Sequence, residues 1–119
     1  MDNKTTIQEL KEKVKKFCED RDWDKYHNPK DLAIGIITEA SELLEHFRFK
    51  SEEDIKQILK YKKQELSEEL ADVFYFVLRL AQRYDIDLAT ELEKKLKKNE
   101  SKYPVNKSKG SNKKYNEIE

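Results

Sequence analysis

Two pairs of acidic residues have the spacing of metal-binding or catalytic carboxylates. Glu39 and Glu42 lie in "ITEASELLEH", and Glu69 and Asp72 lie in "SEELADVFYF". A separation of three residues brings two side chains to neighbouring positions on one helix face. Around the first pair stand apolar residues that we expect to be buried: Ile36, Ile37, Ala40, Leu43, Leu44 and Phe47. The second pair borders a similar apolar face: Leu66, Leu70, Val73 and Val77. The carboxylates should therefore lie at the edge of a core and be partly buried.

The two acid pairs predict a metal site if their helices pack through these apolar faces. The four carboxylates would then converge in one groove, where they repel one another unless they are protonated or neutralised. A hard divalent cation such as Mg²⁺ is the natural remedy, with Mn²⁺ as an alternative. Mg²⁺ prefers oxygen ligands and commonly shares its remaining positions with substrate phosphates. The pattern therefore indicates a magnesium-phosphate site.

Two other interpretations of the acids stay open. Many acid pairs in a highly charged chain only solvate a helix surface, although two pairs beside apolar faces on successive helices are more specific. A carboxylate-bridged di-iron bundle is the second alternative, and it usually needs Glu three residues before His. Leu43 stands three residues before His46, and Asp24 three residues before His27. The di-iron interpretation is weakened by that mismatch.

The composition favours one small helical protein that associates with itself. The chain has 119 residues, of which 36% are hydrophobic and 42% charged, and it contains only two glycines and two prolines. No segment alternates polar and apolar residues convincingly, so we expect an all-α fold. A core this thin gains from oligomerisation.

The charge and cysteine content limit the expected partners and location. Lys plus Arg and Asp plus Glu both number 25, so no global basic field argues for nucleic acid as a partner. The chain is charged from Asp2 onward and no apolar run approaches about 20 residues, so we expect no membrane segment. Cys18 is the only cysteine, which excludes an intramolecular disulfide and favours a cytoplasmic location. We expect Cys18 to be a small core residue.

Apolar spacing and capping residues predict the helices. Four helical regions are expected, at about residues 7–21, 29–47, 52–84 and 88–102. Each begins after a residue that can cap its first turn: Thr6, Asn28, Ser51 and Asp87. The third region should be interrupted near residues 60–63, where apolar spacing lapses, and Pro104 should end the last one. We expect residues 1–103 to form the helical domain and residues 104–119 to be a polar, basic tail that cannot fold alone.

These motifs together carry a resemblance to a known family. "EASE" followed after a linker by "EELAD" resembles the ExxE…ExxD signature of the MazG-like all-α nucleotide pyrophosphohydrolases. "RDWDKYH", "KKNESKYP" and the tail "KGSNKKYNE" are similar to the dCTP pyrophosphatase branch, and the likeness covers nearly the whole chain. The resemblance implies a four- to five-helix bundle assembled as a dimer or a dimer of dimers. It also implies Mg²⁺-dependent hydrolysis of a nucleoside triphosphate to the monophosphate and pyrophosphate.

The resemblance also implies the residues of the catalytic centre. The four acids match the family's metal-binding residues: Glu39, Glu42, Glu69 and Asp72. Glu42 is our candidate for the general base. A second set matches positions that border the nucleotide base: Trp23, His27, Phe49 and Phe76. An aromatic face suits stacking and an imidazole offers a hydrogen bond, although Trp23 could equally be a core anchor and His27 a loop residue. Phe49 and Phe76 stand where close relatives often carry Trp and Tyr, so a polar N–H or O–H is lost and the base preference stays open.

The C-terminal part of the chain carries a third set. The resemblance implies that these residues of the last helix approach the phosphates or the sugar: Lys95, Asn99 and Tyr103. Further residues resemble a tail that folds over a site, its own or that of a neighbouring subunit: Lys113, Lys114 and Tyr115. The alternative interpretation is an ordinary solvated helix face followed by a disordered polar end.

Three functions are compatible with the sequence. The first is removal of dCTP, or a modified relative, from the nucleotide pool. The second is a house-cleaning hydrolase of another noncanonical nucleotide, which would share the acidic site and differ around the base. The third is a non-catalytic helical interaction module, in which the basic segment "NKSKGSNKKY" would contact RNA or another phosphate polymer. Such a module would not need buried acids.

Overall fold

The computed structural model describes residues 1–118, and this range is all-helical, as the sequence predicts. Its α-helices are α1 (Ile7–Asp20), α2 (Pro29–Glu45), α3 (Glu52–Tyr61), α4 (Lys63–Arg83), α5 (Leu88–Lys102) and α6 (Val105–Ser108). Two 3₁₀ turns are η1 (Asp24–Tyr26) and η2 (Tyr115–Glu117). The described residues contain no helix that combines the length and the apolar character needed to cross a membrane.

The helices begin where the predicted capping residues stand. Each of these side chains accepts a hydrogen bond from a backbone N–H of the first turn: Thr6, Asn28, Ser51 and Asp87. Ser51 and Asp54 cap each other reciprocally, and these hydrogen bonds lower the pKa of Asp54. The predicted interruption of the third region is confirmed, because α3 ends at Tyr61 and α4 begins at Lys63. α2 ends at Glu45, two residues before the predicted end.

The chain packs into two compact units. The first is Met1–Asp85 and the second begins at Ile86. The boundary between these units differs from the one that we expect between the helical domain, residues 1–103, and the tail, residues 104–119. That expected boundary stays a prediction. The first unit holds α1 to α4, and the second holds α5, α6 and η2.

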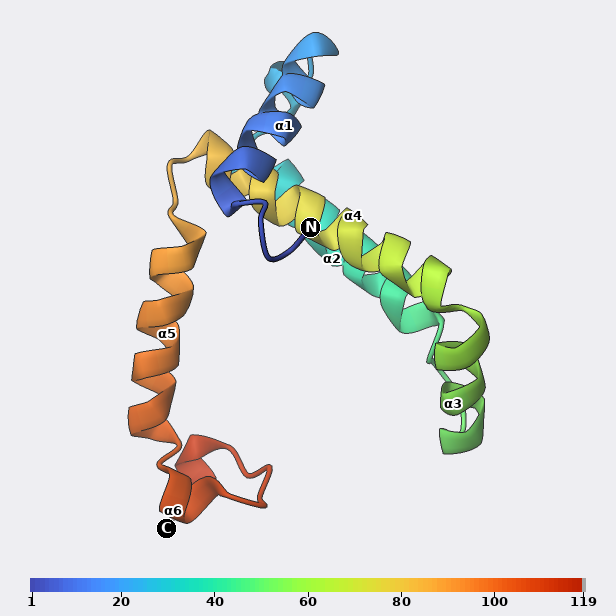
Figure 1. Ribbon diagram of the computed structural model, residues 1–119, viewed down its shortest axis with the longest axis vertical. Helices are drawn as coiled ribbons and strands as arrows, with labels where there is room; N and C mark the ends of the chain where they lie inside the picture. Colours follow the sequence, from blue (N-terminus) through green and yellow to red (C-terminus); the bar gives the residue numbers. More distant parts are fainter. Residues whose placement is uncertain (119) are drawn as a thin grey trace. The chain divides into compact units, whose positions relative to one another are not determined.

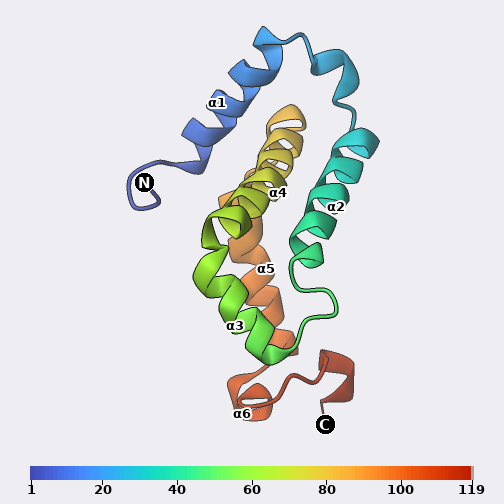
Figure 2. The ribbon, with the colours of Figure 1, turned by 90° about the vertical axis from the view of Figure 1, so that its right-hand side faces the viewer.

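The first unit is built around the pair α2 and α4. These two helices lie side by side and run in opposite directions, while α1 packs on α4 and α3 joins the start of α4 (Figures 1 and 2). The buried apolar side chains are Cys18, Leu32, Ile58, Leu66, Leu78 and Ala81. Cys18 is therefore a core residue, as expected, and its Sγ lies 3.2 Å from the hydroxyl oxygen of Tyr75.

The apolar faces beside the acids are only partly covered. Several of their residues are half-buried, as expected: Ile36, Leu43, Phe47, Val73 and Val77. Other residues that we expect in the core are exposed instead: Ile37, Ala40, Leu44 and Leu70. The expectation was wrong for these four because α2 and α4 cover only one side of each other and leave the adjoining sides open, on α2 at Ile37, Ala40 and Leu44 and on α4 at Leu70. Ile37 keeps 69% of its side chain exposed and Leu44 keeps 58%.

Candidate functional site

The four predicted acids meet between α2 and α4. Glu39 and Glu42 project from α2, and Glu69 and Asp72 from α4. One carboxylate oxygen from each lies within 4.8 Å of the others. Glu39 and Glu69 are half-buried, whereas Glu42 and Asp72 are exposed. The antiparallel packing of two helices therefore turns two local acid pairs into one acidic cluster.

Electrostatic repulsion and burial both act against the full negative charge of this cluster. Burial raises the pKa of Glu39, and the close approach of Glu42 raises it further. Burial also raises the pKa of Glu69, with Glu42 adding to the effect and His46 opposing it. The Nε2 atom of His46 lies 3.7 Å from Oε1 of Glu69. The cluster therefore binds protons more readily than isolated carboxylates do, and a bound cation would relieve the same repulsion.

The residues of the cluster fit a hard divalent cation. All the donors are carboxylate oxygens, the ligand type that Mg²⁺ and Mn²⁺ prefer. Oε2 of Glu69 is buried and has no hydrogen-bond partner among the described residues. A buried carboxylate oxygen without a donor is unfavourable, and coordination of a cation is one way to satisfy it.

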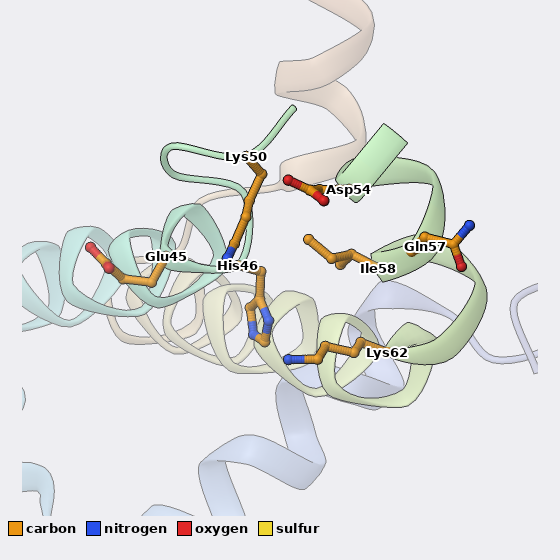
Figure 3. A pocket seen from close by; sticks show the side chains of 7 residues that line it. All are labelled: Glu45, His46, Lys50, Asp54, Gln57, Ile58 and Lys62. Carbon is orange, nitrogen blue, oxygen red and sulfur yellow. The ribbon is translucent and has the colours of Figure 1, made fainter. Parts of the chain in front are cut away.

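A pocket of about 470 Å³ adjoins the cluster at the His46 end (Figure 3). It is lined by Glu45, His46, Lys50, Asp54, Gln57, Ile58 and Lys62. The Lys62 side chain extends toward the His46 ring in this view. Our sequence reasoning missed Lys50 and Lys62. The two lysines stand at opposite ends of α3, and no local pattern in the sequence links them, although both line this pocket.

In the other direction along α4, Phe76 follows one helical turn after Asp72. Its ring lies against Gly35 of α2, where an added Cβ would come within 2.5 Å of two ring atoms. The missing side chain of Gly35 therefore makes room for the neighbouring helix. This places an aromatic ring one helical turn from the acidic cluster.

A row of aromatic rings connects Phe76 to the turn that carries Trp23 and His27. Edge-to-face contacts link Phe76 to Tyr75, Tyr75 to Phe17 and Phe17 to Trp23, with centroid separations of 5.0, 6.0 and 5.7 Å. The rings of Trp23 and His27 follow at 6.1 Å. Three of the four residues predicted to border a base thus belong to one continuous row. Trp23 is a partly exposed member of this row, with 36% of it accessible.

Phe49 lies at the opposite end of α2. His27 precedes the first residue of this helix and Phe49 follows its last turn. A helix of 17 residues is about 25 Å long. The first unit therefore does not bring Phe49 to Trp23 and His27. Phe49 is 91% exposed, has a φ of 62° and stacks against the Arg48 guanidinium at 4.7 Å.

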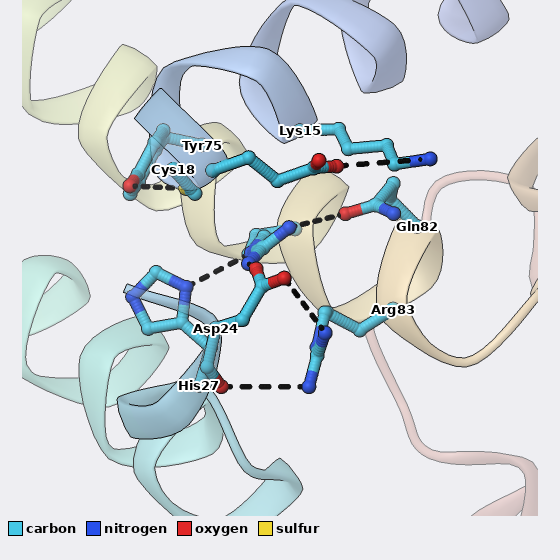
Figure 4. A network of polar contacts seen from close by, with 9 residues as sticks. Lys15, Cys18, Asp24, His27, Tyr75, Gln82 and Arg83 are labelled. Atoms are coloured by element: carbon cyan, nitrogen blue, oxygen red, sulfur yellow. Dashed lines mark hydrogen bonds and ion pairs between the residues drawn. The ribbon is translucent and has the colours of Figure 1, made fainter. Parts of the chain in front are cut away.

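The turn with Trp23 and His27 is held by a buried arginine that our sequence reasoning missed. Arg79 of α4 donates to Nδ1 of His27 at 2.9 Å, to Oε1 of Gln82 at 2.6 Å and to a carboxylate oxygen of Asp24. Arg83 lies 3.6 Å from the other oxygen of that carboxylate. Figure 4 shows this contact network, with Asp24, His27, Gln82 and Arg83 labelled. The hydrogen bond from Arg79 holds the pKa of Asp24 below its usual value.

The remaining predicted residues belong to the second unit. Lys95 and Asn99 stand one turn apart on α5, and Tyr103 caps its C-terminal end. The rings of Tyr103 and Tyr115 lie edge to face at 6.2 Å, and Lys102 covers the Tyr115 ring at 4.5 Å. The tail with Lys113 and Lys114 thus packs on the end of α5. The sequence predicts a tail that cannot fold alone. In the structure, the tail contacts α5 through the rings of Tyr115 and Tyr103.

Comparison with known proteins places the chain in a family. The model of the MazG-like family matches residues 34–118. The dCTP pyrophosphatase 1 proteins of Rattus norvegicus and Homo sapiens are 34% and 30% identical over 115 residues, which is 95% of this chain and 68% of each relative. A crystal structure of a pyrophosphatase from Archaeoglobus fulgidus superposes with a TM-score of 0.78 at 38% identity, covering 82% of this chain and 92% of that one. The chain, whose all-helical fold and paired acids agree with this match, belongs to the MazG-like family.

Proposed function

We propose that this protein is a Mg²⁺-dependent pyrophosphohydrolase of a deoxynucleoside triphosphate, with dCTP or a modified dCTP as the substrate. The products would be the nucleoside monophosphate and pyrophosphate. The observation that carries the proposal is the acidic cluster, in which one oxygen of each of four carboxylates lies within 4.8 Å of the others and Oε2 of Glu69 is buried without a hydrogen-bond partner among the described residues. Membership of the MazG-like family and the identity to dCTP pyrophosphatases support the same activity.

The chemistry requires a water molecule to attack phosphorus while the bond to the departing pyrophosphate breaks. Mg²⁺, held by Glu39, Glu42, Glu69 and Asp72, would supply neutralisation of phosphate charge and a lowered pKa of bound water, with Mn²⁺ as a substitute. Glu42 is our candidate for the general base that accepts the proton of the water. Its carboxylate is exposed and lies beside both Glu39 and Glu69, which suits that role because a base must reach the attacking water by a hydrogen bond.

The pocket beside His46 suits the far end of a triphosphate. Lys50 and Lys62 supply positive charge there, and His46 lies between this pocket and Glu69. We propose that a phosphate group separated from the scissile bond enters this pocket. Glu45 and Asp54 also line this pocket. Their negative charges would repel a phosphate group whose charge is not neutralised by a bound cation.

The aromatic row is our proposed base site. Trp23, His27 and Phe76 border it in one protomer, and stacking on an aromatic face suits any nucleobase. Phe49 is too far away to join them within the first unit. Its 91% exposure is suited to serving the site of a second copy of the chain.

We propose a homodimer or homotetramer in the cytoplasm. Support comes from apolar side chains left exposed on the pair of central helices: Ile34, Ile37, Leu44, Leu70 and Phe74. Burying such residues against a second copy would remove them from water.

We also propose that the C-terminal residues bind substrate. Lys95, Asn99 and Tyr103 would approach the phosphates or the sugar, and Lys113 and Lys114 would fold over a site in the same or a neighbouring subunit. Support comes from the similarity to dCTP pyrophosphatases over 95% of the chain.

The test is an endpoint assay with Mg²⁺ and each common and modified dNTP, in which monophosphate and pyrophosphate are separated from diphosphate and phosphate. Glu69→Gln should lose turnover, while the matched control Glu68→Gln should keep it, because Glu68 is an exposed residue outside the cluster. Turnover of a nucleotide without cytosine would support the proposed mechanism and show that the proposed substrate is wrong. No turnover by the folded, metal-supplied protein would overturn the proposal and favour the interaction module.

A further inference from the structure

Arg79 is a fully buried cation at the point where α4 meets the turn before α2. Its exposed fraction is 0%, and its hydrogen bonds reach two residues of that turn and one of its own helix. The carboxylate of Asp24 balances the charge of the guanidinium, and Oε1 of Gln82 accepts a hydrogen bond from a second nitrogen. The third, from Nε to Nδ1 of His27 at 2.9 Å, has a chemical consequence for the imidazole.

A guanidinium has only hydrogen-bond donors, so the Nδ1 atom of His27 must be the acceptor in this contact. A neutral imidazole that accepts at Nδ1 carries its proton on Nε2. Protonating Nδ1 would bring two N–H groups together and add a positive charge beside Arg79 and Arg83. Burial lowers the pKa of His27, and these two arginines lower it further, while Asp24 opposes them.

The Nε2 atom of His27 is left available by this arrangement. The ring nitrogen that takes no part in the network points away from it in Figure 4. Within the described part of the chain, the imidazole makes its hydrogen bond through Nδ1. The buried side-chain atoms that lack a partner do not include Nε2 of His27. The Trp23 ring lies beside the imidazole, with centroids 6.1 Å apart.

We propose that Arg79 is a positioning residue that fixes His27 as the Nε2–H tautomer, so that the imidazole presents one hydrogen-bond donor to an acceptor atom of the nucleotide base. This inference rests on the proposed function, because it takes the aromatic row as the base site. A ring nitrogen or carbonyl oxygen on the base edge is the matching chemistry. Arg79 acts through His27 and does not itself touch the substrate.

The first experiment reads the tautomer in the free protein, without substrate or turnover. Long-range ¹H–¹⁵N NMR correlations report which ring nitrogen carries the proton, and the chain has only two histidines. Signals that disappear in His27→Gln assign His27. Arg79→Met should increase the Nδ1–H population and raise the pH midpoint of His27. Gln82→Met removes a different partner of the same guanidinium and should leave both readouts unchanged. An unchanged tautomer and midpoint in folded Arg79→Met would overturn the proposal.

The second experiment asks whether this positioning matters for substrate binding. Arg79→Met should raise KM about three- to tenfold and change kcat by less than about twofold, as expected for one hydrogen bond lost from binding. In the His27→Gln background, where no tautomer exists, Arg79→Met should have little further effect on KM. Equal effects in both backgrounds would show a merely structural role and overturn the proposal. Absence of turnover in the wild type would overturn the proposed function alone, because the NMR result decides the tautomer independently.

Discussion

The ring of Phe76 occupies the space that a side chain on Gly35 would need. A Cβ added to Gly35 would lie 2.5 Å from both Cδ1 and Cε1 of the ring, closer than atoms can pack. The contact sets how closely α2 approaches α4 one helical turn from the acidic cluster. The positions of the four carboxylates therefore depend on a residue that has no side chain of its own.

Gly35→Ala should destabilise the fold and reduce turnover. Overpacking of this kind costs about 1–3 kcal/mol, and the better helix propensity of Ala returns at most about 1 kcal/mol. Chemical unfolding and the nucleotide assay measure the two effects. In the Phe76→Leu background, which leaves more room, Gly35→Ala should be less harmful. Equal destabilisation in both backgrounds would show that the ring is not the obstacle.

Without a divalent cation, the first unit should lose stability as the pH rises. The pKa values of Glu39 and Glu69 in the folded protein are raised above the ordinary value of 4.5. The folded state therefore binds more protons than the unfolded state from about pH 4.5 up to the raised values, and the free energy of unfolding falls across that window. Glu39→Gln should reduce this fall, whereas Glu68→Gln should not. Urea unfolding in EDTA between pH 4 and pH 7 measures it, and a flat profile for the wild type would contradict the prediction.

Addition of Mg²⁺ should reverse this loss. An ion that binds only the folded state stabilises it by about 2.7 kcal/mol at 100 times its dissociation constant. We expect thermal unfolding at pH 7 to shift upward with Mg²⁺ or Mn²⁺ in the wild type and in Glu68→Gln. The shift should be absent in Glu69→Gln, which lacks a ligand of the cluster. An equal shift in all three proteins would indicate nonspecific binding.

Asp24→Asn should weaken the contact network around Arg79 and change the response to acid. The hydrogen bond from Arg79 lowers the pKa of Asp24 below 3.8, so the stabilisation is present above that value and is lost as the pH falls through the lowered pKa. The variant should be less stable at neutral pH and lose less stability below about pH 4. Asp22→Asn is the control, since Asp22 is an exposed acid paired only with Lys25 among the described residues. Thermal melts at pH 2.5, 4 and 7 would distinguish the variants, and identical acid profiles would refute the role of Asp24.

Ile37→Glu and Leu44→Glu should weaken self-association. Both side chains are exposed in the protomer, and a charge placed on an apolar interface must be desolvated when a second copy binds. Analytical ultracentrifugation over a range of concentrations would give the mass of each variant. Thr38→Glu introduces the same charge at an exposed polar position between them and serves as the comparison. A wild-type protein that remains monomeric throughout would disprove the proposed oligomer.

The helices could be predicted from the order of the residues alone, because the signals for them are local. Thr6, Asn28, Ser51 and Asp87 each cap the first turn that follows them, so neighbouring residues suffice to predict the start. The spacing of three within each acid pair also lies inside a single helix. The resemblance to the MazG-like family links the two pairs at the level of sequence, because the ExxE…ExxD signature contains both.

Contacts between residues that are distant in the chain depend on how the helices pack. His27 and Arg79 are 52 positions apart, and no local pattern predicts that one guanidinium will fix the imidazole. The exposure of Ile37 and Leu44 likewise depends on which side of α2 receives α4. Helix periodicity defines a face, but the packing of two helices selects the part of that face that is buried, since burial is a property of the pair.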